Sequence, residues 1–194
     1  MSINIGLALG GGGARGAAHI GVLQVLHEQG INFDHIAGTS AGSVIGAMYA
    51  YKQDPQWIEE QFRAFMASSD FKAMGTKRIQ ADLYPDSALG QMVKFVRNRI
   101  ILVMSQQKSF IVKREKLEKA IGFLVPAKKF ADLSIPLFVT STDLQSGELI
   151  IHNQGNLIDA LVLSCTIPGY VEATRRGEQV LVDGGVIDPV PVDI

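Results

Sequence analysis

The segment that most constrains how this chain can fold is Gly38-Thr39-Ser40-Ala41-Gly42, which has the pattern G-x-S-x-G. In this pattern a serine lies in a sharp turn between a strand and a helix, and its hydroxyl points outward from the turn. The residues before Gly38 predict a strand that ends near Ala37, and the small apolar residues 41–50 predict a buried helix. We therefore expect an α/β fold in which Ser40 is a candidate nucleophile.

Hydrophobic patterning predicts the remaining strands and helices. Short apolar runs bounded by turn residues predict strands at 3–9, 136–142, 148–152 and 179–182. Apolar spacing and capping residues predict helices that begin near Ala18, at Asp54-Pro55 and near residue 156. The more polar residues 68–130 predict a helical excursion from the sheet, with helices near 87–105 and 113–123.

A glycine-rich loop, Gly11-Gly12-Gly13-Ala14-Arg15-Gly16, follows the first predicted strand. Its G-x-G-x-x-G spacing, with Asp34 18 residues beyond Gly16, resembles a dinucleotide-binding fingerprint. In that fold, however, the acidic residue ends the second strand, and here the serine turn occupies that place. The alternative is an oxyanion hole, in which the backbone N–H groups of Gly11, Gly12 and Gly13 bind a small anion, and Arg15 orders the loop or adds positive potential.

The base that would activate Ser40 is not an obvious histidine. A Ser–acid–His order would require a histidine after the acid, and the four histidines all precede Asp183: His19, His27, His35 and His152. Asp183 itself follows an apolar strand pattern and precedes Gly184-Gly185. An aspartate of this kind is common in turns, but burial would raise its pKa and make it a better base. We therefore expect a Ser40–Asp183 dyad.

These motifs resemble the patatin-like phospholipase family, in the bacterial branch that is similar to the catalytic domain of neuropathy target esterase. The resemblance rests on the glycine loop, the serine turn and the Asp-Gly-Gly motif in the family's order, supported by three further segments: Thr142 to Glu148, Ser164 to Gly169 and Pro189 to Val192. It implies a three-layer α/β/α fold with a mostly parallel central sheet.

The resemblance also implies a function, a serine lipid acyl hydrolase that acts on phospholipid or lysophospholipid esters through an acyl-enzyme. Ser40 would attack the ester, Asp183 would accept its proton, and the glycine loop would hold the oxyanion. The other motif residues would support this site: Arg15, Gly16, Gly38, Gly42, Gly184 and Gly185. No metal and no organic cofactor is implied. The alternatives are an acyltransferase and a catalytically weak lipid-binding module.

Two features depart from the family. Tyr170-Val171-Glu172 stands where an aromatic-proline pair is usual, which changes the expected shape of the substrate pocket. The sequence also stops at Ile194, where relatives usually continue through another strand and helix. We therefore expect residues 1–194 to form one patatin-like phospholipase domain with an uncovered sheet edge or apolar face that favours a homo-oligomer.

Charge and composition limit the partners. The net charge of −1 does not favour nucleic acid, and the single cysteine, Cys165, fits a reducing compartment. Residues 97–129, however, carry nine Lys or Arg against two Glu, beside the apolar residues 100–104. This region is either a solvated helix face or a contact with an anionic membrane. Because residues 3–9 read as a strand and not as a signal peptide, we expect a cytoplasmic protein that can touch the inner face of the membrane.

Overall fold

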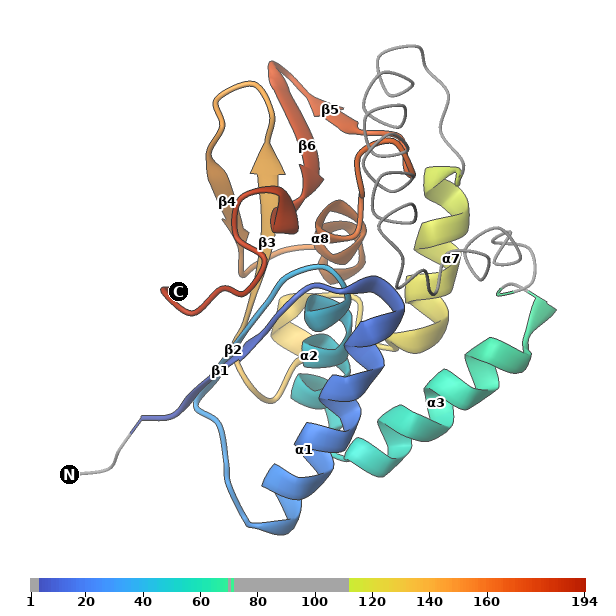
Figure 1. Ribbon diagram of the computed structural model, residues 1–194, viewed down its shortest axis with the longest axis vertical. Coiled ribbons are helices and arrows are strands. Elements are labelled where there is room, and N and C mark those ends of the chain that lie inside the picture. Colours follow the sequence, from blue (N-terminus) through green and yellow to red (C-terminus); the bar gives the residue numbers. More distant parts are fainter. Residues whose placement is uncertain (1–3, 70, 72–111) are drawn as a thin grey trace, which may run out of the picture.

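A computed structural model describes residues 4–69, 71 and 112–194 of the chain (Figure 1). The α-helices are α1 (Ala18–Glu28), α2 (Ala41–Lys52), α3 (Pro55–Ala67), α7 (Arg114–Leu124) and α8 (Leu157–Ser164). The strands are β1 (Gly6–Leu9), β2 (His35–Gly38), β3 (Leu137–Asp143), β4 (Leu149–His152), β5 (Thr174–Arg176) and β6 (Gln179–Asp183). Three short 3-10 turns are η1 (Gly13–Ala17), η2 (Phe130–Asp132) and η3 (Gly184–Val186).

The strands form one mixed sheet in the order β1-β2-β3-β6-β5, with β4 also paired to β3. The pairs β1–β2 and β2–β3 are parallel, whereas β4 and β6 are antiparallel to β3 and β5 is antiparallel to β6. It follows that β1, β2, β3 and β5 share one direction and only β4 and β6 oppose it, so most of the described strands run parallel.

The register shows that β2 and β6 lie along the same edge of β3. Val139 pairs with Gly38 of β2 and also with His152 of β4, so these two strands lie on opposite edges. Ser141 pairs with Asp183 of β6 and again with β4, so β6 lies opposite β4 and therefore on the β2 edge. Because β2 and β6 run in opposite directions, their carboxyl ends meet, about 7 Å apart along β3.

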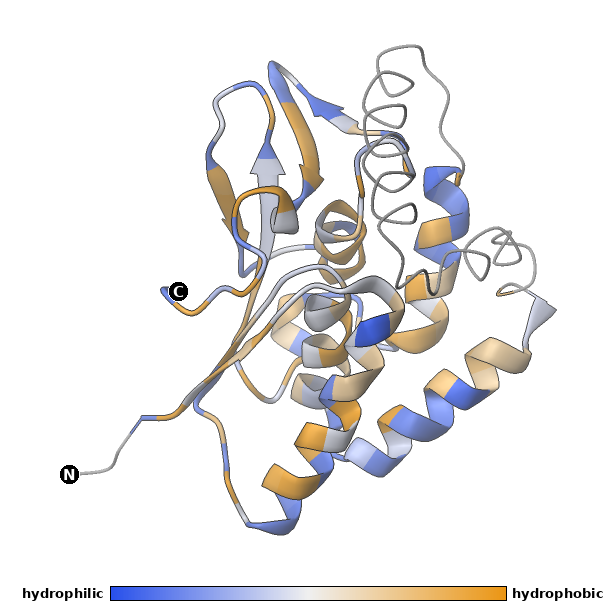
Figure 2. Ribbon diagram, in the orientation of Figure 1, coloured by the Kyte–Doolittle hydropathy of each residue, from blue (hydrophilic) through white to orange (hydrophobic). Residues whose placement is uncertain are grey.

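Helices α2 and α8 pack on the sheet and form the centre of the core. The segment from Gly42 to Ala50 is buried at every position, and Gly46 faces Ile36 and Leu137 of the sheet. Residues 160–163 of α8 are also buried and apolar. Along α1 and α3, by contrast, apolar and polar residues alternate (Figure 2), as expected for helices that cover a core and face water on the other side.

The structure confirms most of the predicted elements and adds β5 and the three 3-10 turns. Asp54 caps α3 by accepting a hydrogen bond from the Trp57 N–H at 2.9 Å, as its sequence predicts. The turn η1 separates the glycine loop from α1, and β5 was not predicted because it is only three residues long and contains two arginines. The predicted helix 87–105 lies outside the described residues. Among the described helices, none is long and apolar enough to cross a membrane.

Candidate active site

The serine turn has the geometry that its sequence predicts. Ser40 lies between β2 and α2 with φ 54° and ψ −124°, one of two non-glycine residues with positive φ in the described part of the chain. A backbone conformation of this kind costs about 1–3 kcal/mol and persists only where the surroundings hold it. Ser40 is also only 6% exposed.

Two glycines allow α2 to pack directly against the strands beneath it. A Cβ at Gly42 would lie 2.6 Å from the Gly10 carbonyl oxygen and would collide with that of Leu9. A Cβ at Gly38 would lie 2.5 Å from Ser43 Cα. These glycines are therefore required by close backbone contact, and they bring Ser40 to the carboxyl end of the sheet.

Side-chain hydrogen bonds hold the backbone of Ser40 on both sides. Its N–H donates to Ser164 Oγ at 2.8 Å, and its carbonyl oxygen accepts from Ser43 Oγ at 2.6 Å. Ser164 and Ser43 are completely buried. Ser164 lies in one of the segments that resemble the family, but its sequence position predicts no role for it. Because Ser164 is 124 residues from Ser40, no local pattern could have revealed this contact.

Asp183 lies where the carboxyl end of β6 meets that of β2. It is 6% exposed, and its Oδ1 accepts a hydrogen bond from the Gly185 N–H at 2.8 Å. Burial raises the pKa of the Asp183 carboxyl above its usual range, and hydrogen bonds from the Ser40 hydroxyl and the Gly185 N–H oppose that rise. The structure therefore brings Ser40 and Asp183 close enough to interact, with the carboxyl in a poorly solvated position.

The glycine loop lies beside the serine turn. A Cβ at Gly11 would be 3.3 Å from Ser40 Cβ. The Gly11 N–H, one of the three predicted oxyanion donors, is already bonded to the Pro189 carbonyl oxygen at 2.9 Å. No acceptor in the described residues takes the N–H of Gly12 or Gly13, so these two donors are the ones available to a ligand.

The four histidines do not complete a triad. In the described part of the chain none has a hydrogen bond to Ser40 or Asp183. His19 Nε2 lies 2.8 Å from the Gly10 carbonyl oxygen, and His152 Nε2 lies 2.8 Å from Ser141 Oγ. Burial lowers the pKa of His152, and the nearby Arg176 lowers it further.

The dinucleotide interpretation also lacks support in the geometry. Asp34 accepts a hydrogen bond from the Ile5 N–H at 2.7 Å, just before β1 begins. It therefore lies at the amino ends of β1 and β2, whereas the glycine loop follows their carboxyl ends. No group of three or more potential metal-ligating side chains occurs among the described residues.

Cys165 lies next to the candidate dyad. Burial raises the pKa of its thiol, and the negative charge of Asp183 raises it further. Hydrogen bonds with the Ser40 and Ser43 side chains oppose this rise. The thiol therefore stays protonated at neutral pH and does not compete with Ser40 as a nucleophile.

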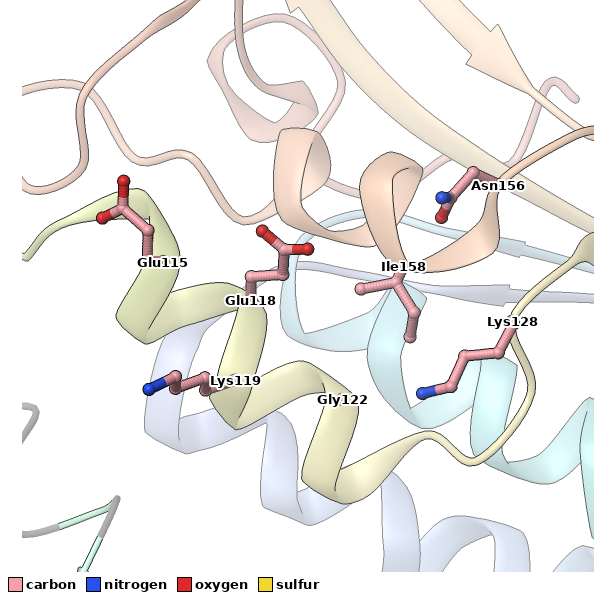
Figure 3. Close-up of a pocket in the computed structure, with 7 residues that line it drawn as sticks. All are labelled: Glu115, Glu118, Lys119, Gly122, Lys128, Asn156 and Ile158. Atoms are coloured by element: carbon pink, nitrogen blue, oxygen red, sulfur yellow. The ribbon is translucent and has the colours of Figure 1, made fainter.

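An open groove of about 430 Å³ lies between α7 and the start of α8, away from the serine turn (Figure 3). Charged and polar side chains line most of it: Glu115, Glu118, Lys119, Lys128 and Asn156, with Gly122 and Ile158. None of these residues belongs to the serine turn, the glycine loop or the Asp-Gly-Gly motif. The groove is therefore separate from the candidate site at Ser40 and Asp183.

A mixed sheet flanked by helices, with a serine at a tight strand-to-helix turn, defines a class of α/β proteins that present a serine between a strand and a helix. Within that class the family is shown by a match of residues 7–194 to the model of the patatin-like phospholipase family, to which this chain belongs. The predicted family is thereby confirmed.

Individual relatives agree with this assignment. The chain is 34% identical to a patatin-like phospholipase domain-containing protein of Caenorhabditis elegans, over 98% of this chain and 12% of the relative. It is 33% identical to an uncharacterized NTE family protein of Mycobacterium tuberculosis (98% and 28%) and 30% identical to human patatin-like phospholipase domain-containing protein 6 (98% and 12%). The chain thus spans about an eighth to about a quarter of these relatives.

A solved structure supports the fold. The crystal structure of VipD from Legionella pneumophila matches with a TM-score of 0.55 at 19% identity, over 95% of this chain and 46% of that chain. At this identity the match concerns the fold alone. Together with the family match it confirms the predicted three-layer α/β/α fold.

Proposed function

We propose that this chain is a serine lipid acyl hydrolase, with Ser40 as the nucleophile and Asp183 as its base. The observation that carries the proposal is the meeting of a serine held at positive φ with a buried aspartate, at the carboxyl ends of two strands on one edge of β3. Membership of the patatin-like phospholipase family favours a phospholipid or lysophospholipid as the substrate.

In the first half of the reaction, Ser40 Oγ attacks the ester carbonyl carbon while its proton moves to the Asp183 carboxylate. The negative charge on the carbonyl oxygen is stabilised by the N–H groups of Gly12 and Gly13, and one well-placed donor of this kind contributes about 3 kcal/mol. The ester C–O bond then breaks, and Asp183 returns its proton to the departing alcohol. An acyl-Ser40 ester remains.

In the second half, water attacks the acyl-enzyme. Asp183 accepts a proton from the water as the new C–O bond forms, the bond to Ser40 Oγ breaks, and the proton passes to that oxygen. The products are a fatty acid and the free enzyme. The raised pKa of Asp183 suits this role, because a general base is most effective when its pKa lies near the working pH.

We also propose that the basic region 97–129 contacts an anionic membrane. Residues 97–111 of this region lie outside the described residues. Arg114 is bonded to Asp159 and Thr174, so it serves the fold. A charge reversal at Arg114 would disturb these bonds. The membrane contact is therefore tested with the double variant Lys113→Glu and Lys119→Glu, which changes two exposed lysines. We expect this double variant to lose binding to vesicles that contain phosphatidylserine, and unchanged binding would contradict the contact.

The function is tested by the hydrolysis of a medium-chain p-nitrophenyl ester and by fatty-acid release from lysophosphatidylcholine. We expect Ser40→Ala to abolish both activities and covalent labelling by a fluorophosphonate. Asp183→Asn should reduce turnover by a factor of about 10³ or more, because the serine then lacks its base. The matched controls are Ser134→Ala and Asp193→Asn, which change exposed residues away from the dyad.

Other outcomes separate the alternatives. Product esters formed with an added alcohol, in place of free fatty acid, would favour the acyltransferase. Vesicle binding without turnover or labelling in the wild type would favour the lipid-binding module and would contradict the proposed hydrolase.

A further inference from the structure

One peptide group in the glycine loop is held by hydrogen bonds at both of its polar atoms. The Gly10 carbonyl oxygen lies 2.8 Å from His19 Nε2, and the Gly11 N–H donates to the Pro189 carbonyl oxygen at 2.9 Å. The carbonyl of Gly10 and the N–H of Gly11 belong to the same planar peptide unit. Its orientation is therefore fixed from two sides, by α1 and by the segment that follows the Asp-Gly-Gly motif.

This peptide group directly precedes the two donors of the proposed oxyanion hole. Gly12 has φ 163° and Gly13 has φ 55°, and a Cβ at Gly13 would meet nothing within 4 Å. Packing around Gly13 therefore does not fix the loop, and glycine backbones adopt many conformations. On the C-terminal side, the Gly12 carbonyl oxygen accepts from the Arg15 N–H at 3.1 Å, which holds the Gly12–Gly13 peptide. On the N-terminal side, the bonded Gly10–Gly11 peptide is the fixed point next to the peptide that carries the Gly12 N–H.

The hydrogen bond also defines which nitrogen of His19 carries a proton. A carbonyl oxygen can only accept, so Nε2 must be the donor. Both the neutral Nε2–H tautomer and the imidazolium ion can donate from this position. The contact requires neither proton transfer nor contact with the substrate.

We propose that His19 is a positioning residue of the oxyanion hole, which acts on the reaction through the Gly10–Gly11 peptide. This inference rests on the proposed hydrolase function. His19 is half-buried in the first turn of α1 and, in the described part of the chain, is the one histidine bonded to the glycine loop. It orients the loop and is neither the general base nor a ligand of the substrate.

The test compares three variants of the full chain. His19→Leu removes the donor, and His19→Gln keeps an N–H donor near the position of Nε2. His27→Leu is the matched control, because it removes a histidine from the last turn of the same helix, and the side-chain hydrogen bond of His27, between Nδ1 and Tyr49 Oη at 3.5 Å, does not involve the glycine loop. The measurements are kcat and KM for the p-nitrophenyl ester, the rate of fluorophosphonate labelling, the melting temperature and amide exchange at Gly11.

We expect His19→Leu to lower kcat and the labelling rate by at least about tenfold, because loss of one oxyanion donor lowers kcat by about 10²–10³. KM should change little, since the oxyanion forms only in the transition state. His19→Gln should recover most of the lost rate, and His27→Leu should behave as wild type. The Gly11 amide should exchange faster in His19→Leu than in His19→Gln.

Equal kcat values for His19→Leu and His27→Leu would overturn the inference alone, and so would the failure of His19→Gln to recover the rate while its melting temperature matches wild type. A wild-type chain without turnover or labelling would remove the proposed function, and the positioning role with it. Failure of the His19 inference and failure of the proposed hydrolase function therefore give different results.

Discussion

The nucleophile side and the base side of the candidate site are held in different ways. On the nucleophile side, backbone packs against backbone at Gly38 and Gly42, and buried serines bond both polar atoms of the Ser40 main chain. On the base side, Asp183 is buried with a raised pKa, so its ionised form is poorly stabilised. The difference indicates that the packing around Ser40 stabilises the fold, whereas the burial of Asp183 costs stability, a cost that the proposed role of Asp183 as a base would explain.

The largest loss of stability is expected where a substitution disturbs the close backbone packing beside Ser40. In Gly42→Ala the new Cβ would lie 2.6 Å from the Gly10 carbonyl oxygen and would collide with that of Leu9, and both are backbone atoms that cannot turn away. We expect the free energy of unfolding to fall by about 4 kcal/mol or more, measured by urea unfolding.

Gly21→Ala is the matched control for this change, because a Cβ at Gly21 meets nothing within 4 Å and the residue lies inside α1. It should leave stability unchanged or raise it by about 0.5–1 kcal/mol. If both variants unfold at the same urea concentration as wild type, the close packing at Gly42 does not stabilise the Ser40 side of the site, and the contrast with the Asp183 side does not hold.

An intermediate effect is expected at Ser164. Ser164→Ala leaves the buried N–H of Ser40 without its acceptor, which should cost about 1–3 kcal/mol in the free energy of unfolding. Turnover should fall as well, because the unusual φ of Ser40 loses a restraint. The matched control is Thr166→Val. This variant also removes one buried hydrogen bond, from Thr166 Oγ1 to the Val162 carbonyl oxygen, and that bond does not involve Ser40.

Thermal unfolding and kcat measured together distinguish the two roles. Similar losses of stability in both variants, with a fall in kcat only for Ser164→Ala, would support a specific role for the Ser40 contact. Equal kcat values in the two variants would show that this hydrogen bond serves the fold alone. Ser164→Thr keeps the hydroxyl acceptor and should recover kcat.

The smallest change in stability, and one that raises it, is expected for a substitution of Asp183. The pKa of Asp183 is higher in the folded state than in the unfolded state. Its contribution to the free energy of unfolding is therefore fully present below the unfolded pKa of about 4 and is lost as the pH rises through the folded pKa. Asp183→Asn removes the ionisation. We therefore expect this inactive variant to melt at a higher temperature than wild type at pH 7, with a smaller difference near pH 4.

Exposed Asp193 provides the control, since Asp193→Asn should not reproduce that pH-dependent difference. An Asp183→Asn variant that melts below wild type at pH 7 would show that the carboxylate is well stabilised in the fold. On the proposed mechanism, the same raised pKa predicts that kcat/KM of the wild type declines toward acid with a midpoint above about pH 4.

The sequence was sufficient for the features that depend on local chemistry. The G-x-S-x-G pattern predicted the strand, the turn and the helix around Ser40, and Asp54-Pro55 predicted the start of α3. The shared edge of β3 could not be predicted, because it depends on the register of strands that are distant in sequence. The same holds for the bond from Gly11 to Pro189, in which the acceptor is a backbone carbonyl that any residue could supply.

The meeting of β2 and β6 on one edge of β3 has a consequence for protein synthesis. A ribosome makes the glycine loop and Ser40 early, and it adds Asp183 and the Pro189 carbonyl only after every other described strand. A nascent chain therefore lacks the proposed base Asp183, and its Gly11 N–H lacks the Pro189 acceptor, until residues 183–189 have been made. On the proposed mechanism, a chain that ends before Asp183 would therefore not cleave lipid.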